Sequence, residues 1–137
     1  MADVLYVVMR WLHLSSMATL IGGILYGRLV MTPAERALSP EAGKAVDAKA
    51  AASYRPFVIF AICGLVLSGT YNILTNPGHS PTYHMLLGIK LLLALHVFAV
   101  AILITRADNP RRARMMTGVI LSGLTILAIS AYLRRIF

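Results

Sequence analysis

Residues 83–105 read YHMLLGIKLLLALHVFAVAILIT, an apolar run interrupted by one lysine and two histidines. A helix needs roughly 20 apolar residues to cross about 30 Å of hydrocarbon, and this run is long enough. Its apolar residues are continuous and do not alternate with polar ones, which excludes a strand of a membrane β-barrel. The stretch therefore predicts a transmembrane α-helix that carries Lys90 and His96 inside the bilayer.

Three further runs of this kind, at residues 4–31, 56–75 and 115–133, occupy most of the remaining chain. The 137 residues are 58% hydrophobic and only 13% charged, too apolar for a soluble globular domain. Four spans leave room for one small bundle. We therefore predict an all-α protein, an antiparallel four-helix bundle embedded in a lipid bilayer, with residues 1–137 forming a single domain.

The connections predict how the spans follow one another. Asn76-Pro77-Gly78 and Asp108-Asn109-Pro110 are turn signals, which favour an up-down-up-down order. The long connection at 32–54 is rich in alanine, and Thr32-Pro33 and Ser39-Pro40-Glu41 each place a hydroxyl N-cap before a proline. We expect this connection to be partly helical and to lie along the cytoplasmic face.

The net charge of +8 reports orientation in a membrane protein of this kind. Lys and Arg gather in the connections at 32–55 and 106–114, whereas the connection at 76–82 contains neither. By the positive-inside rule, both termini and the connection at 76–82 face outward. We expect a multi-pass protein of the bacterial inner membrane, in which the basic connections set topology and do not bind nucleic acid.

Two cations, Arg10 and Lys90, lie well inside the apolar spans together with His13 and His96. All five acids of the chain, Asp3, Glu35, Glu41, Asp47 and Asp108, fall at the N-terminus or between spans. A cation held in hydrocarbon without a counter-charge costs from about 3 to more than 10 kcal/mol. We infer that an anion not encoded by the chain lies beside these cations, and that the histidines hold a metal with it.

The two histidines predict a haem. The first and third spans run in the same direction, and His13 and His96 lie roughly 14 and 20 Å below the outer boundary. Axial ligation of haem b between these two spans requires such matched depths. Arg10 stands one turn outward of His13 and is expected to bind a propionate, while Gly88 gives room to the macrocycle and Met17 shields its edge.

Lys90 is expected to serve a different purpose, because it is about 120° around the helix from His96. We expect it to line a polar pocket in the outer half with Tyr71, as candidate catalytic residues. A quinone, a porphyrin or another small redox partner would enter there. The protein would then be an electron-transfer protein or, if it is an enzyme, an oxidoreductase.

Other interpretations stay open. Met9, His13 and Met17, spaced at i, i+4 and i+8, could bind Cu(I) in a copper-binding or copper-uptake protein. His79 and His84 could hold a further metal. The small pair Gly23 and Gly27 favours close helix packing, and copies of the chain could also associate into a homo-oligomer.

Two runs resemble known membrane families. Residues 13–28, HLSSMATLIGGILYGR, resemble the first helix of HemJ-type protoporphyrinogen oxidases, and residues 83–93, YHMLLGIKLLL, resemble a helix of the CopD (copper-resistance D) membrane domain. The resemblance implies a four-helix bundle, often haem-b binding in the HemJ branch, with His13 as the matching ligand and Lys90 as the matching functional lysine. It implies protoporphyrinogen oxidation or copper uptake as the activity.

Overall fold

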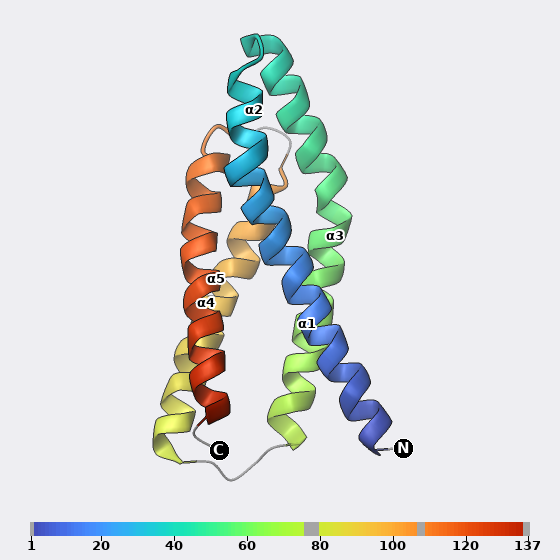
Figure 1. The fold of residues 1–137 in the computed structure, drawn as a ribbon, viewed down its shortest axis with the longest axis vertical. Coiled ribbons are helices and arrows are strands. Elements are labelled where there is room, and N and C mark those ends of the chain that lie inside the picture. Colours follow the sequence, from blue (N-terminus) through green and yellow to red (C-terminus); the bar gives the residue numbers. More distant parts are fainter. Residues whose placement is uncertain (1, 76–79, 107–108, 136–137) are drawn as a thin grey trace.

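The computed structural model describes residues 2–75, 80–106 and 109–135 (Figure 1). Its elements are α1 (Ala2–Tyr26), the π-helical turn η1 (Gly27–Met31), α2 (Thr32–Arg36), α3 (Pro40–Thr75), α4 (Pro81–Ile104) and α5 (Arg112–Arg135). Among the described residues, four helices are long and apolar enough to cross a membrane, the first of them formed by α1, η1 and α2 together. The predicted all-α membrane bundle is confirmed, whereas the turn at Asn76-Pro77-Gly78, His79 and Asp108 lie outside the described residues.

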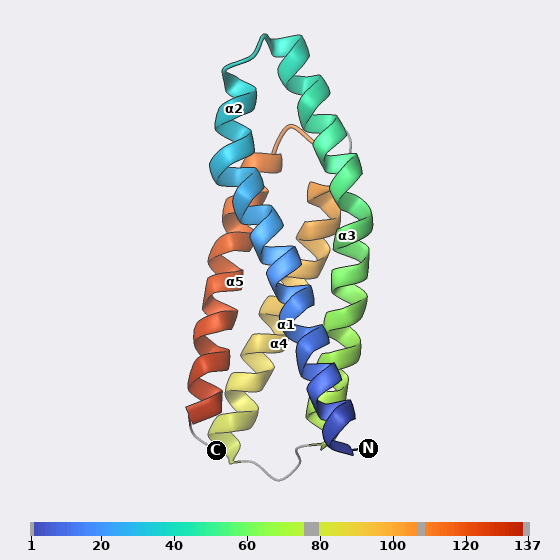
Figure 2. The same cartoon turned by 45° about the vertical axis from the view of Figure 1, so that its right-hand side comes forward.

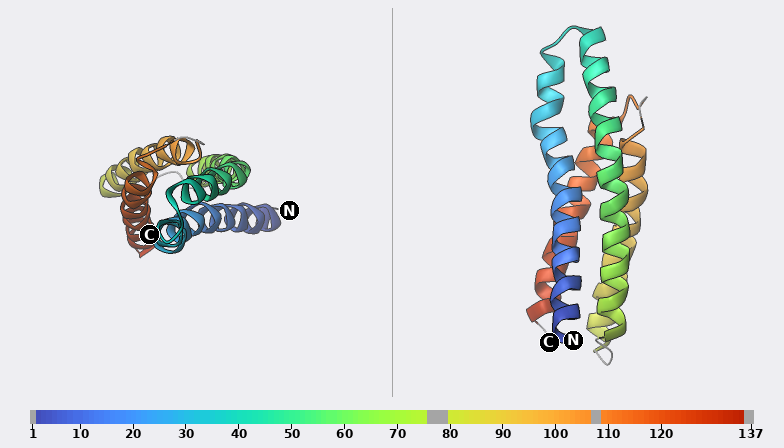
Figure 3. Two further views of the ribbon diagram at one scale, coloured as in Figure 1. Left: turned by 90° about the horizontal axis from the view of Figure 1, so that it is seen from above. Right: turned by 90° about the vertical axis from the view of Figure 1, so that its right-hand side faces the viewer.

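The helices form two antiparallel pairs. α1 packs along α3 and α4 packs along α5, and the two pairs meet mainly through α1 with α5 and α3 with α4 (Figure 2 and Figure 3). We call the end that holds the start of α1 and the end of α5 the terminal end, and the end that holds α2 the loop end. The pairs lie close together toward the loop end and stand apart at the terminal end (Figure 1).

Small residues allow α1 and α3 to approach each other closely. A Cβ atom added at Gly23 would collide with the ring of Tyr54, and one added at Gly64 would collide with Ser16. The Tyr54 hydroxyl donates across the same interface to the carbonyl oxygen of Thr19, at 2.7 Å. These contacts bind the two helices into one rigid pair.

The connection at 32–54 is more helical than expected. α2 continues from α1 through η1, and the hydroxyl of Thr32 donates to the carbonyl oxygen of Gly27 at 2.9 Å instead of capping a new helix. Ser39 is an N-cap as predicted, since its hydroxyl accepts the backbone N–H of Ala42 at 3.3 Å. α3 begins at Pro40 and, with 36 residues, is about 54 Å long, so its first turns extend beyond the part that crosses the membrane.

The hydrophobic core lies mainly toward the loop end. Its buried members are Leu20 and Ile24 of α1, Val58 and Ala61 of α3, Val97, Ala101 and Ile104 of α4, and Val119 and Ile126 of α5. Many other large apolar side chains are exposed, among them Phe60 (78%) and Leu92 (70%). Exposure of such side chains suits a surface covered by lipid, where no water penalises it.

Candidate functional site

The histidine of α1 lies between α1 and α3. Nδ1 of His13 is 2.9 Å from the hydroxyl oxygen of Ser68, a side chain with 0% exposure. His13 is half-buried and lies on the same face of α1 as the buried Leu20, two helical turns further along. Its ring therefore belongs to the interior of the bundle.

The hydroxyl of Ser68 decides which ring nitrogen of His13 carries the hydrogen. Its oxygen lies 2.7 Å from the carbonyl oxygen of Gly64, one turn earlier on α3, and a serine hydroxyl has a single hydrogen to donate. Since that hydrogen goes to Gly64, Ser68 accepts from Nδ1–H of His13. Neutral His13 then keeps its lone pair on Nε2. This is the state in which an imidazole binds a metal while a protein partner holds its other nitrogen.

Two cations lie within electrostatic range of the His13 ring, Arg10 on α1 and Lys90 on α4. Arg10 reaches the hydroxyl of Tyr6 at 3.5 Å, and Lys90 makes no hydrogen bond with the part of the chain that the structure describes. No described carboxylate forms an ion pair with either cation. The layer around His13 thus contains two positive charges, and no carboxylate among the described residues pairs with them.

The second histidine lies elsewhere. Nδ1 of His96 is 3.1 Å from the hydroxyl oxygen of Ser122 on α5, and the His96 side chain is exposed. Lys90, about 120° away around α4, is the half-buried residue of the two. From the sequence we expected His13 and His96 to face each other. The structure instead pairs each imidazole with a serine of its neighbouring helix and does not bring the two rings together.

The serine partner of His96 does not fix the ring hydrogen in this way. Within the described residues, the hydroxyl of Ser122 has no other hydrogen-bond acceptor, so it can donate to Nδ1 of His96 or accept from Nδ1–H. A neutral His96 can therefore carry its ring hydrogen on either nitrogen. His13 is therefore the better prepared of the two histidines to bind a metal through Nε2.

Two glycines show where space remains beside the helices. A Cβ atom added at Gly69 or at Gly88 would meet no atom within 4 Å. Gly69 follows Leu65 by one turn, and Leu65 packs against the core, so Gly69 opens toward the inside of the bundle. Gly88 is exposed and lies nearly opposite Lys90 around α4. The room for a macrocycle that we expected at Gly88 therefore lies on the exposed side of α4, away from the bundle interior. The sequence analysis did not predict the room at the inward-facing Gly69.

Tyr71 and Met17 flank the layer of His13. Tyr71, three residues after Ser68 toward the terminal end, is half-buried, and within the described residues its hydroxyl forms no hydrogen bond. Met17, one turn from His13 toward the loop end, packs against the hydrophobic core. Met9, on the other side of His13, is half-buried. Both methionines therefore flank His13 on one face of α1, as the copper interpretation requires.

The described residues contain no group of three or more His, Cys, Asp or Glu side chains that could hold a metal ion. His84, considered above as a metal ligand, is exposed and meets the ring of Tyr83 edge to face, with centroids 5.7 Å apart. A metal beside His13 would therefore need ligands from outside the described side chains, such as those that a haem would bring.

The chemistry of this layer fits a haem b. His13 offers Nε2 as an axial ligand, and Arg10 and Lys90 carry the charge that propionates require. Gly69 directly follows Ser68 on α3, and an added Cβ atom there would meet nothing within 4 Å. Ligand atom, counter-charges and space thus come together in one layer.

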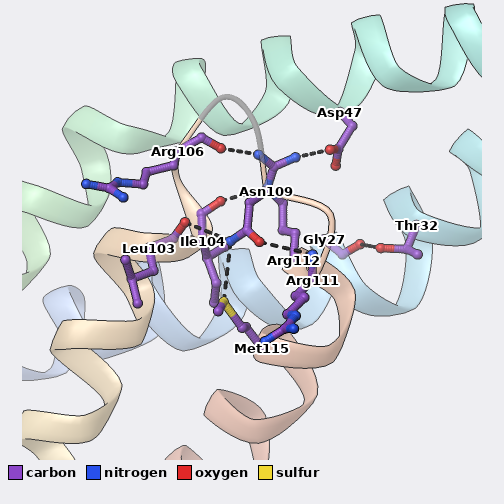
Figure 4. A network of polar contacts seen from close by, with 10 residues as sticks. All are labelled: Gly27, Thr32, Asp47, Leu103, Ile104, Arg106, Asn109, Arg111, Arg112 and Met115. Carbon is purple, nitrogen blue, oxygen red and sulfur yellow. Dashed lines mark hydrogen bonds and ion pairs between the residues drawn. The ribbon is translucent and has the colours of Figure 1, made fainter.

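A second polar cluster, at the loop end, is complete within the chain (Figure 4). Arg112 is 4% exposed, and its Nε donates to the carbonyl oxygen of Ile104 at 2.7 Å. Its terminal nitrogens donate to the carbonyl oxygen of Arg106 and to the carboxylate of Asp47. From the sequence we expected only a topology role for the basic residues of this connection, so the burial of Arg112 was missed.

A comparison of the chain with protein-family models, curated proteins and solved structures found no match. The resemblance to HemJ-type and CopD proteins therefore stays a prediction. The function has to be argued from the chemistry of the layer around His13.

Proposed function

We propose that the protein is a small b-type cytochrome of the bacterial inner membrane, with haem b between the α1–α3 and α4–α5 pairs and His13 as its axial ligand. The observation that carries this proposal is the hydrogen bond from Nδ1 of His13 to Ser68. Because Ser68 donates to Gly64, it orients the imidazole and leaves the Nε2 lone pair available. A metal-binding histidine usually donates its other ring N–H to a carboxylate, a backbone carbonyl or water, and the hydroxyl oxygen of Ser68 would accept it here.

Arg10 and Lys90 are the proposed partners of the haem propionates. From the sequence we did not expect Lys90 to bind a propionate, because it is about 120° around the helix from His96. It lies, however, within electrostatic range of His13. Propionates beside these side chains would supply the negative charge that no described carboxylate provides. The positive charge that is costly without a partner would then stabilise the cofactor.

With His96 bonded to Ser122, His13 would be the histidine that holds the haem. The haem, when bound, supplies one-electron chemistry. Lys90, within electrostatic range of His13, and Tyr71, three residues after Ser68 on α3, would orient an anionic or hydroxyl-bearing redox partner, such as a quinone or a porphyrin. The proposed role is electron transfer or oxidoreduction with this partner.

The positions of the basic residues support one orientation. Lys44, Lys49, Arg55, Arg106 and Arg111 all lie in or beside the connections at the loop end. By the positive-inside rule the loop end would face the cytoplasm and both termini the outside. The haem layer would then lie in the outer half of the membrane.

The test is to purify the protein from membranes and record its reduced-minus-oxidised spectrum with iron and copper analysis. We expect a Soret and an α band of haem b, a positive pyridine haemochrome and iron without copper. Copper without iron would replace the proposal by Cu(I) binding at Met9, His13 and Met17. A colourless protein with neither metal would overturn both.

A further inference from the structure

A cavity of about 290 Å³ lies at the loop end, where α1, η1, α2 and α3 meet the ends of α4 and α5. Its wall includes the small residues Gly23, Gly27, Ala50 and Ala51. Gly23 is ten residues, or about 15 Å, along α1 from His13. The cavity is therefore separate from the proposed haem layer.

Most side-chain donors in the cavity wall already donate to oxygen atoms of the chain. They are Thr32 (to Gly27), Tyr54 (to Thr19), Thr105 (to Ile102) and Arg112 (to Ile104, Arg106 and Asp47). The remaining one, the hydroxyl of the 57% exposed Tyr26, is neutral and can also accept. The only cation in the described wall, Arg112, is therefore already paired, and none is left to bind an anionic ligand.

The carboxylates of the cavity wall, which are hydrogen-bond acceptors, are less fully paired than its donors. Glu35 is half-buried at the cavity, and its carboxylate accepts no hydrogen bond from the residues that the structure describes. The carboxylate of Asp47 is shared with Arg112. Arg112 also lies within electrostatic range of Glu35. Two carboxylates against one guanidinium still leave the wall with one negative charge in excess, and Glu35 is the carboxylate that no described residue hydrogen-bonds.

We infer that this cavity binds a small organic cation, with its ammonium group against Glu35 and its apolar body against Met31, Ile104 and Met116. A cavity of about 150 Å³ accommodates benzene, so about 290 Å³ suits an aromatic ring with a short aminoalkyl chain. A charged donor makes the stronger hydrogen bond to a carboxylate, and a neutral ligand leaves Glu35 without its counter-charge. The inference does not depend on the haem.

The test compares three ligands of similar shape on the purified full-length protein by isothermal titration calorimetry: phenethylammonium, 2-phenylethanol and 3-phenylpropanoate. We expect phenethylammonium to bind at one site per chain, at least about tenfold more tightly than the alcohol, a factor of ten being 1.4 kcal/mol. The anion should not bind. Glu35→Gln should remove the preference for the cation, whereas Glu41→Gln, an exposed carboxylate on α3, should keep it.

A second variant tests the cavity itself. Ala50→Leu fills the wall without changing a charge and should abolish binding of phenethylammonium while Glu35 is intact. No saturable binding of the cation, equal binding of cation and alcohol, or an unchanged preference in Glu35→Gln would overturn the inference. A colourless preparation that binds the cation would overturn the proposed cytochrome and leave the cation site standing.

Discussion

The two ends of the bundle treat their buried charges in opposite ways. At the loop end, Arg112 is 4% exposed and donates to two carbonyl groups and to Asp47 (Figure 4). At the terminal end, Arg10 and Lys90 lie around His13, and no described carboxylate pairs with them. The chain thus completes one polar cluster itself and leaves the other incomplete.

This difference separates a structural cluster from a binding site. A buried charge without a partner is expensive, and a folded chain retains it when something outside the chain supplies the partner. The core residues of α1, Leu20 and Ile24, follow His13 toward the loop end, so packing is concentrated where Arg112 is paired. Substitutions that break the contacts of Arg112 should therefore alter stability, and those around His13 should alter cofactor binding.

Blocking the space beside Gly69 should have the largest effect. Gly69→Trp places an indole in the inward space where an added Cβ meets nothing within 4 Å, so we expect haem binding to be lost while helix content is kept. Gly88→Trp makes the same change on the exposed face of α4 and should retain haem. The haem-to-protein ratio and circular dichroism measure the two effects. Equal haem content in both variants would count against a haem between the helix pairs.

Breaking the ion pair at the loop end should come next. Asp47→Ala leaves Arg112 without its counter-charge and should lower the free energy of unfolding by about 2 kcal/mol, less than for a fully buried pair because Asp47 is 33% exposed. Haem content should be unchanged. Denaturant unfolding in detergent measures the loss, with the exposed Glu41→Ala as control. A loss of haem before any loss of stability would contradict the division between the two ends.

Removing the serine partner of His13 should have a moderate effect. Ser68→Ala frees Nδ1 of His13 and should weaken haem binding by about tenfold. Ser122→Ala removes the equivalent contact of His96 and should leave the affinity unchanged. Titration of haem into the apoprotein compares the two variants. The reverse order of effects would assign the haem to His96.

Neutralising Lys90 should have the smallest effect. It should change the stability of the haem-free protein and the affinity for haem in opposite directions. Lys90→Met removes an unpaired cation, so we expect the haem-free protein to gain about 1 kcal/mol of stability. Haem affinity should fall at the same time, because one propionate partner is lost. Unfolding of the apoprotein and haem titration give the two numbers, with the exposed Lys49→Met as control. A variant that is less stable without haem would show that Lys90 has a structural role.

The spans and their order could be predicted because long apolar runs determine them. The rotation of each helix about its own axis could not be predicted from the sequence. The sequence shows that Lys90 and His96 are about 120° apart, but only packing shows that Lys90 is half-buried and His96 exposed. Likewise the small residue Gly23 was recognised, whereas its contact with Tyr54 required the structure.

Long-range polar contacts were also beyond the sequence. Arg112 is one of several basic residues in its connection, and its partner Asp47 is 65 residues away. The Ser68 contact of His13 spans 55 residues, so the orientation of His13 could not be read from α1 alone. Local patterns identify which residues are chemically unusual, and tertiary contacts decide which of them are already satisfied.

The most direct test of the central claim is the haem content of His13→Ala beside that of His96→Ala, measured by pyridine haemochrome on proteins purified in the same way. The account predicts that His13→Ala is colourless and still helical by circular dichroism, and that His96→Ala keeps the haem of the unsubstituted protein. Retention of haem in His13→Ala, or its loss in His96→Ala alone, would contradict the account.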